Sequence, residues 1–322
     1  MAQAISNELG QRLSFAHLSG ELHQGIQKFM EKCPHLQDLT LHPIESRSGA
    51  PYSLAPLAEL KAFRSYFLFA CFERPLFESF PSVETLEVSM GQLRRHSEKE
   101  FLNGIRYVKS LKTDLIVPDG VITAVYNDID PSGATLSHEF VVEAVATVCH
   151  LERLSVMGGA VRSSDRVYEA HAPMLEVVIC RSNWPQLKQL DLRSIPISLK
   201  ELEAICERFS LLRHLSLFIV KKFNMECLFK LKALEEMSLE IWEGSDYDIK
   251  ELFATGNALF PLDLNGYDGL SAFPRAQKFH LSFNCGEYLL VKTTIGEVQR
   301  WLCPTEADGT WLLDNLNQEP QA

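Results

Sequence analysis

One stretch of the sequence carries oxygen ligands at the spacing of a calcium-binding loop. Asp128, Asp130, Ser132, Gly133 and Glu139 occupy positions 1, 3, 5, 6 and 12 of an EF-hand loop. Carboxylate and hydroxyl oxygens suit Ca²⁺, and the glycine permits the sharp turn that the loop needs. The residues before this loop are β-branched, however, and the sequence has no second loop of this kind to pair with it.

The same residues also fit the start of a helix. Ser137 has the side chain of an N-cap, and Glu139 then lies in the first turn, where the helix dipole favours negative charge. We therefore predict that no calcium binds at this loop, and that the chain holds no metal or other cofactor.

Sequence motifs of catalysis are absent. The chain has no Gly-x-Ser-x-Gly, no Gly-x-x-x-x-Gly-Lys-Ser/Thr, no Gly-x-Gly-x-x-Gly and no His-Glu-x-x-His. Cys-x-x-Cys is also missing, so structural zinc is not expected. Cys149 and His150 are neighbours, but adjacent residues on a strand point in different directions. The sequence therefore favours a protein that is not an enzyme.

A short strand phrase, Leu-x-x-Leu-x-Leu, organises the chain. It begins at Leu187, at Leu212 and, with Met237 in the fourth place, at Leu234, at intervals of 25 (212 − 187) and 22 (234 − 212). Between the first two phrases, Ser198 and Glu201 form a capping box before an apolar helical pattern. A strand that alternates with a helix at this period is typical of leucine-rich repeats.

Weaker copies of the phrase extend the pattern along the chain. We place repeat starts at Leu36, Leu57, Val83, Val108, Leu151, Leu187, Leu212, Leu234 and Ala276. This predicts an α/β solenoid with a parallel β-sheet on its concave side and helices or irregular segments on its convex side, because one repeat cannot bury its apolar face alone. The predicted organisation is a weakly patterned segment 1–18, a repeat domain 19–314 with insertions near 118–137, 158–182 and 244–274, and a frayed tail 315–322.

The repeats resemble those of the F-box leucine-rich-repeat proteins. In that family a helix ends in Cys-Pro-x-Leu and leads into the strand, as Cys33 to Leu36 does here, and Cys149 to Leu151 is a second instance without the proline. The resemblance implies a substrate-binding region of a ubiquitin ligase, with a cullin–RING adaptor as a further partner. No Leu-Pro-x-Glu phrase precedes Leu36. Either an F-box is missing from this chain, or the repeats never served a ligase.

The composition narrows the class of partner. The net charge is −11, from 31 Lys and Arg against 42 Asp and Glu, which argues against a nucleic-acid partner. Eight cysteines in 322 residues are too few for a disulfide scaffold, and we expect Cys33, Cys149 and Cys206 to be buried thiols. There is no signal-peptide pattern and no long apolar run, so no membrane partner is expected, and we predict a cytoplasmic or nuclear location.

The candidate binding residues lie on the side of the strands that points away from the core. In each phrase the third, fifth and seventh residues have this direction, because side chains alternate along a strand. Most are small or polar, and the exceptions are apolar or charged residues typical of interfaces. The predicted partner-binding residues are Phe218, Trp242, Met157, Arg193, Glu240, Arg153 and His214. Two alternatives stay open: the insertions cover this face, or they build an enzyme or small-molecule site of their own.

Overall fold

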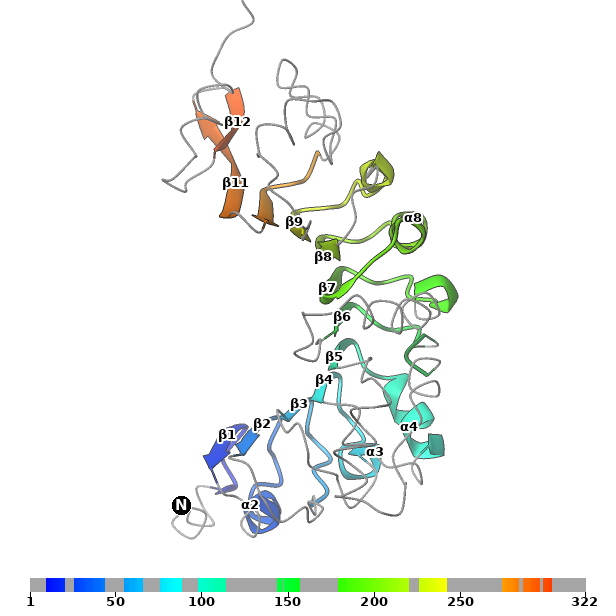
Figure 1. Ribbon diagram of the computed structural model, residues 1–322. Coiled ribbons are helices and arrows are strands. Elements are labelled where there is room, and N and C mark those ends of the chain that lie inside the picture. Colours follow the sequence, from blue (N-terminus) through cyan, green and yellow to red (C-terminus); the bar gives the residue numbers. More distant parts are fainter. Residues whose placement is uncertain are drawn as a thin grey trace, which may run out of the picture. The chain divides into compact units, whose positions relative to one another are not determined.

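The chain folds into two compact units, Met1–Trp184 and Pro185–Ala322 (Figure 1). A computed structural model describes residues 10–20, 26–43, 55–65, 76–88, 98–113, 144–146, 148–156, 179–219, 226–241, 274–283, 286–295 and 298–302. Each unit is an α/β structure built on a parallel sheet. The candidate calcium loop, most of the three predicted insertions and the tail 315–322 lie outside the described residues.

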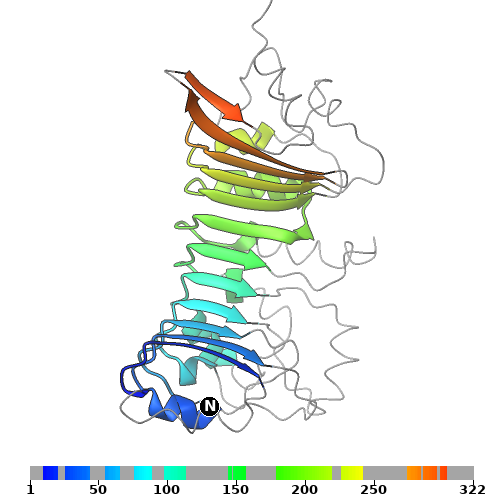
Figure 2. The same cartoon turned by 90° about the vertical axis from the view of Figure 1, so that its left-hand side faces the viewer.

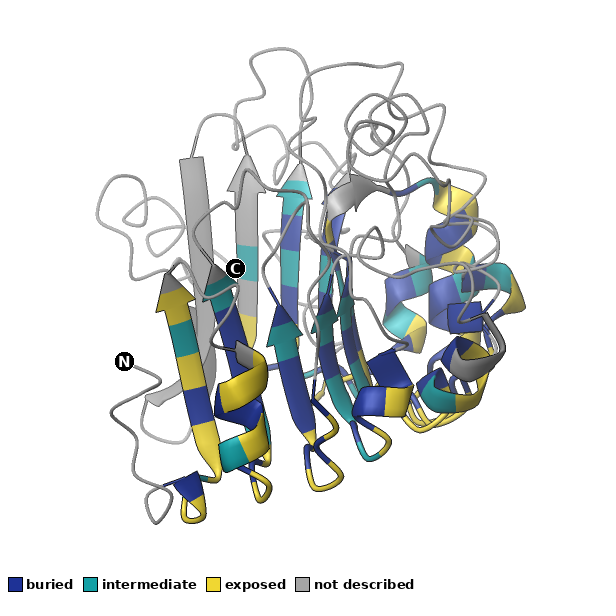
Figure 3. Cartoon of the chain, turned by 90° about the horizontal axis from the view of Figure 1, so that it is seen from below, coloured by how far each residue is buried: buried dark blue, intermediate teal, exposed yellow. Residues whose placement is uncertain are grey.

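The first unit contains parallel strands in the order of the sequence. They are β1 (Phe15–Gly20), β2 (Asp38–Pro43), β3 (Ala62–Ser65), β4 (Thr85–Val88), β5 (Ser110–Thr113) and β6 (Arg153–Val156). The described helices cover one face of this sheet, and they are α2 (Ile26–Lys32), α3 (Leu76–Ser79) and α4 (Glu98–Ile105). Buried residues occur both on the strands and on these helices, as the dark blue segments of Figure 3 show.

The second unit begins in the same way and ends differently. Its parallel strands are β7 (Gln189–Pro196), β8 (His214–Ile219), β9 (Glu236–Ile241) and β10 (Lys278–Phe283) (Figure 2). Helix α8 (Leu199–Arg208) and the 3-10 helix η4 (Glu226–Lys230) cover one face. Strands β11 (Gly286–Ile295) and β12 (Val298–Leu302) then add to β10 in antiparallel fashion.

The same turn precedes most of the strands. The first residue of the phrase donates its N–H to the carbonyl three residues earlier, as Leu36 does to Cys33 (3.2 Å) and Leu212 to Phe209 (3.0 Å). The residue that supplies this carbonyl is itself buried. The strand then starts at a carbonyl of the previous repeat: the Lys61 oxygen accepts from two successive N–H groups, those of Glu84 (2.8 Å) and Thr85 (2.9 Å). Each repeat thus uses its neighbour both for its core and for its backbone hydrogen bonds.

The strand register corrects the predicted repeat start at Leu57. Strand β3 pairs Phe63 with Leu39, so the phrase begins three residues later, at Leu60. Leu57 takes the place of Cys33 in the turn, since its carbonyl accepts from the N–H of Leu60 (3.3 Å). The intervals become 24 (60 − 36) and 23 (83 − 60), which are more regular than the predicted ones. The prediction failed because two leucines three residues apart both fit the pattern, and Phe63 was not recognised as the core residue.

The segment 1–18 contains part of a repeat that the sequence analysis missed. Strand β1 pairs Ala16 with Leu39 and Leu18 with Leu41, so the phrase is Leu13-x-x-Ala16-x-Leu18. The N–H of Leu13 donates to the carbonyl of Gly10 (3.3 Å), as in the other turns. The phrase was overlooked because Ala16 fills a place where leucine is expected. In the described residues, β1 forms the first strand of the sheet.

Cys149 is exposed, which contradicts its prediction as a buried thiol. The residue three before Leu151 is Val148, which is buried and holds the place that Cys33 holds before Leu36. Cys149 therefore matches Pro34 in the turn, and Pro34 is exposed as well. Cys33 and Cys206 are buried as predicted.

Candidate functional site on the open face of the sheet

The candidate site is the sheet face that carries the third, fifth and seventh residues of each strand phrase, which we call the open face. The described helices lie on the opposite face in both units (Figure 1). Parallel pairing in register stacks the fifth residues into one row per unit, so that neighbouring members lie on adjacent strands. In the first unit this row consists of His17, Thr40, Arg64, Glu87, Lys112 and Ser155.

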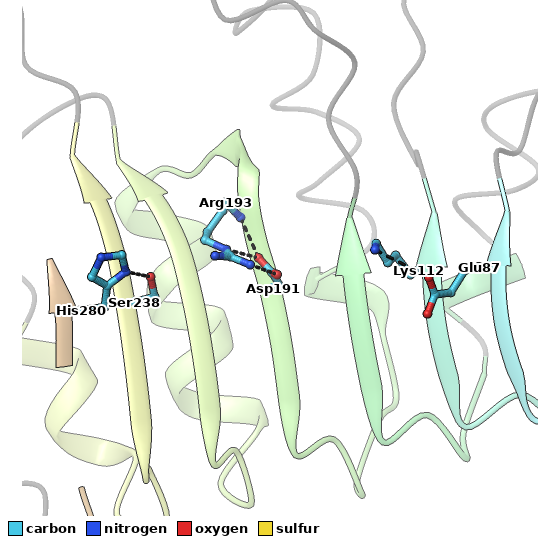
Figure 4. Close-up of polar contacts among 6 residues, drawn as sticks. All are labelled: Glu87, Lys112, Asp191, Arg193, Ser238 and His280. Atoms are coloured by element: carbon cyan, nitrogen blue, oxygen red, sulfur yellow. Dashed lines mark hydrogen bonds and ion pairs between the residues drawn. The ribbon is translucent and has the colours of Figure 1, made fainter. Parts of the chain in front are cut away.

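Four charged residues of the first unit form what we call the charged ladder: Asp38, Arg64, Glu87 and Lys112. Arg64 lies between two carboxylates, with Nη1 2.6 Å from Asp38 Oδ1 and Nε 3.2 Å from Glu87 Oε1. The Nζ of Lys112 lies 3.6 Å from the second oxygen of Glu87 (Figure 4). Acid and base therefore alternate across β2, β3, β4 and β5, and each charge has an opposite charge on the next strand.

Arg64 is the centre of the charged ladder. Its side chain is 25% exposed, which is low for an arginine on a sheet surface. Partial burial favours the neutral guanidine, but the hydrogen bonds and charges of Asp38 and Glu87 outweigh it, so the pKa of Arg64 is raised. The guanidinium of Arg64 is thus held between two carboxylates on the neighbouring strands.

The two ends of the first unit's open face differ from its centre. At β1, the ring of His17 stacks on that of His42 with centroids 4.6 Å apart, and Phe15 is 57% exposed. At β6, Arg153 is exposed at the third position of its strand phrase, and Ser155 is half-buried at the fifth. Arg153 therefore points away from the core, as its strand direction predicted, and its role in partner binding stays a prediction.

In the second unit an arginine folds back on its own strand. Arg193 donates from Nε to Asp191 Oδ1 (3.0 Å) and from Nη2 to Asp191 Oδ2 (2.8 Å), a two-point contact between guanidinium and carboxylate (Figure 4). The hydrogen bond to Asp191, followed by the charges of Asp191 and Glu240, raises the pKa of Arg193. The charge of Glu240 thus acts on Arg193 in the same direction as that of Asp191. His214 lies half-buried on β8, in register with Gln189 and Glu236.

A serine and a histidine meet further along the second unit's row. Ser238 Oγ lies 3.3 Å from His280 Nδ1 (Figure 4). At this distance the hydrogen bond is weak. Asp191 and Ser216 occupy the preceding places of the row. Among the described residues, no group of three or more His, Cys, Asp or Glu side chains could hold a metal ion.

The predicted apolar centre of the site is not supported at Phe218. Only 9% of its surface is exposed, although it has the outward strand direction. Strand β7 contains an irregularity between Leu192 and Pro196, after which Pro196 pairs with Phe218 and the N–H of Ile197 donates to its carbonyl (3.1 Å). The backbone of this longer strand runs alongside Phe218, and Phe218 is not the exposed aromatic that we expected. Trp242 and Met157 lie outside the described residues.

Three residues of the open face were missed. Arg64, Lys112 and His280 hold the fifth positions of the strand phrases that form β3, β5 and β10. All three belong to phrases that we recognised only weakly, because Ala62, Thr113 or Ala276 stands near a place where leucine is expected. The signal that finds them is a regular interval: placing the phrase at Leu60 makes Arg64 the counterpart of Thr40.

No protein-family model matches the chain, and no curated protein matches it in sequence. In the part of the chain that the structure describes, no helix is long and apolar enough to span a membrane.

Proposed function

We propose that the chain is a leucine-rich-repeat protein that binds a protein partner on its open face, without catalysing a reaction. Support for the repeat class comes from the strand phrase itself, which returns at intervals of 22 to 25 residues wherever consecutive repeats are described without an insertion. The in-register parallel strands and the shared turn agree with repeats of one kind. Repeat proteins of this construction use the extended sheet face for binding.

The observation that carries the proposal is the charged ladder. Its charged groups are fixed by one another and remain partly exposed, with the side chain of Lys112 39% exposed. Ion pairs that are held in place cost little ordering when a partner docks, and charges at an interface set its orientation and exclude wrong partners. Arg153 lies on β6, two strands away from Glu87 on β4, and extends the charged surface. We therefore favour a partner with a polar, charged contact surface.

The more specific proposal follows the resemblance to F-box leucine-rich-repeat proteins. In this proposal the open face holds a substrate protein, and a cullin–RING adaptor is reached through a segment other than the described repeats. The buried thiols Cys33 and Cys206 suit a reducing compartment, so the proposed location is the cytoplasm or the nucleus.

A capture experiment with matched charge reversals tests this proposal. Lys112→Glu replaces the lysine of the charged ladder by a third carboxylate, next to Glu87, on the open face. Lys28→Glu makes the same charge reversal on the exposed surface of helix α2. The tagged protein and both variants are used as bait in the source cells, and captured proteins are quantified by mass spectrometry. We expect Lys112→Glu to lower recovery of the main partner by about tenfold, and Lys28→Glu to leave it unchanged.

Two results would contradict the proposal at its two levels. Equal recovery with both variants shows that the partner does not use the charged ladder. A partner that depends on Lys112, captured without any cullin adaptor, supports the binding surface but removes the ubiquitin-ligase role.

A further inference from the structure

Two cysteines from neighbouring repeats meet on the helical side of the second unit. Cys206 lies in the last turn of α8, Cys227 lies in η4, and the two positions are 21 residues apart (227 − 206). The thiol groups are hydrogen-bonded to each other. Directly beside them, Lys230 Nζ lies 3.1 Å from Glu207 Oε1, so an ion pair also joins α8 to η4. The two sulfur atoms are therefore held close together by the packing of two elements.

The two thiols have different surroundings. Cys206 is 3% exposed, and the pKa of its thiol is raised by the hydrogen bond to Cys227 and by burial. Cys227 is half-buried, and the pKa of its thiol is lowered. The hydrogen bond from Cys206 is the largest cause, and the charge of Lys230 and the N–H of Leu228 act in the same direction. Cys227 is thus the more accessible thiol and the more readily ionised one, and Cys206 is the buried thiol of the pair.

We propose that Cys206 and Cys227 form an oxidation site, at which a peroxide converts the two thiols into a disulfide that links α8 to η4. The Cys227 thiolate attacks one oxygen of hydrogen peroxide, the O–O bond breaks, and hydroxide leaves a sulfenic acid on Cys227. The sulfur of Cys206 then attacks the sulfenic sulfur, the S–S bond forms, the S–O bond breaks, and the departing hydroxyl takes the Cys206 proton as water. The hydroxide of the first step takes up the proton that Cys227 lost on ionising, so two thiols are oxidised and one peroxide is reduced to two waters.

The consequence lies on the other face of the same repeats. Cys206 precedes β8, which carries His214, and Cys227 precedes β9, which carries Glu240. The disulfide closes the chain around β8 and limits how far these two repeats can separate. Oxidation would thereby make this part of the open face more rigid, whichever partner binds there.

The matched comparison within the chain is Cys149, which is exposed and for which no cysteine partner is described. Reduced, purified protein is treated with hydrogen peroxide, quenched at intervals with an alkylating reagent, and digested without reduction for mass spectrometry. We expect a linked peptide pair containing Cys206 and Cys227 to form about tenfold faster than Cys149 is oxidised. If Cys149 reacts first and the linked pair does not form, the proposal is wrong.

Two serine variants separate the roles of the thiols. In Cys206→Ser, which removes the resolving thiol, Cys227 should accumulate as a sulfenic acid that dimedone traps. In Cys227→Ser, Cys206 should stay reduced and dimedone should label neither position. Circular dichroism checks that each variant is folded, and the wild-type peptide map decides the proposal even if one variant is not. Equal dimedone labelling of the two variants would overturn the assignment of Cys227 as the reacting thiol.

Discussion

Replacing Arg64 tests whether the charged ladder is a fixed structure. Arg64→Met keeps an unbranched apolar side chain of similar length and removes only the guanidinium. Asp38 and Glu87 then lose the cation that lies between them, while Glu87 keeps its contact with Lys112 (3.6 Å). The matched control is Lys61→Met, because Lys61 forms an ion pair with Glu84 in the same unit at 3.8 Å, with both side chains more exposed.

The expected magnitude follows from exposure and geometry. Two unit charges about 4 Å apart near a protein surface attract each other by about 4 kcal/mol before costs are counted. Desolvation and the ordering of the side chains offset most of this, and exposed pairs retain only about 0–1 kcal/mol. Arg64 has two carboxylate partners and is 25% exposed, so we expect Arg64→Met to lower the free energy of unfolding by about 1.5 kcal/mol. For Lys61→Met we expect about 0.5 kcal/mol or less.

Urea unfolding followed by circular dichroism measures both variants. With a slope of about 3 kcal/mol per M, the Arg64 change moves the midpoint of the affected transition by about 0.5 M, and the slope itself stays constant. The double variant with Glu87→Gln should show a coupling energy of about 1 kcal/mol between the two residues. If Arg64→Met and Lys61→Met shift the midpoint equally, the ladder adds nothing beyond ordinary surface pairs, and the argument for a prearranged binding surface fails.

Three further predictions concern the core, helix packing and pH dependence. Phe63→Ala should cost about 3–5 kcal/mol in urea unfolding because Phe63 is fully buried; a change below about 1 kcal/mol would contradict the corrected register. Gly104→Ala places a methyl group against the ring and Cβ of Phe77, and should lower the melting temperature markedly, whereas an unchanged melting temperature would show that α3 and α4 are not so close. The hydrogen bond from Lys109 lowers the pKa of Glu84 from its ordinary value of 4.5. The Glu84–Lys109 pair therefore stabilises the fold above pH 4.5, and this contribution is lost as the pH falls through the pKa of Glu84 in the folded protein. In an acid titration, the difference in stability between wild type and Glu84→Gln should shrink in that pH range and not elsewhere at acid pH.

Much of the fold could be predicted because its core positions repeat. Leucine at the first, fourth and sixth places of the phrase correctly predicted the strands at Leu187, Leu212 and Leu234. The capping box correctly predicted the start of α8. The N–H of Ser198 donates to Glu201 Oε2 (2.6 Å), and the Ser198 hydroxyl is also hydrogen-bonded to Glu201. The pattern fails where another type of residue occupies a core position of the phrase. Ala16 still packs in the core of β1, so periodicity of leucine alone could not find that strand.

The candidate site was predicted less well than the fold. Strand direction correctly placed Arg153, Arg193 and Glu240, since it depends only on the alternation of side chains. Exposure depends in addition on what the connections do, and the long β7 that accompanies Phe218 was not visible in the phrase. The charged ladder needs the register of several strands at once. Because the phrase was placed at Leu57 and not at Leu60, three residues too early, Arg64 was not predicted on the open face.

Site-specific photocrosslinking tests most directly whether the open face holds a protein partner. A benzophenone amino acid replaces Thr85, which lies on the open face of β4 beside the ladder, or Glu78, which is exposed on helix α3. After irradiation in the source cells, we predict that the Thr85 position forms a cross-link to a second protein, that Lys112→Glu removes this cross-link, and that the Glu78 position does not form it. Cross-links from Thr85 only to other segments of the same chain would show that the protein covers its own open face, and would contradict the proposed function.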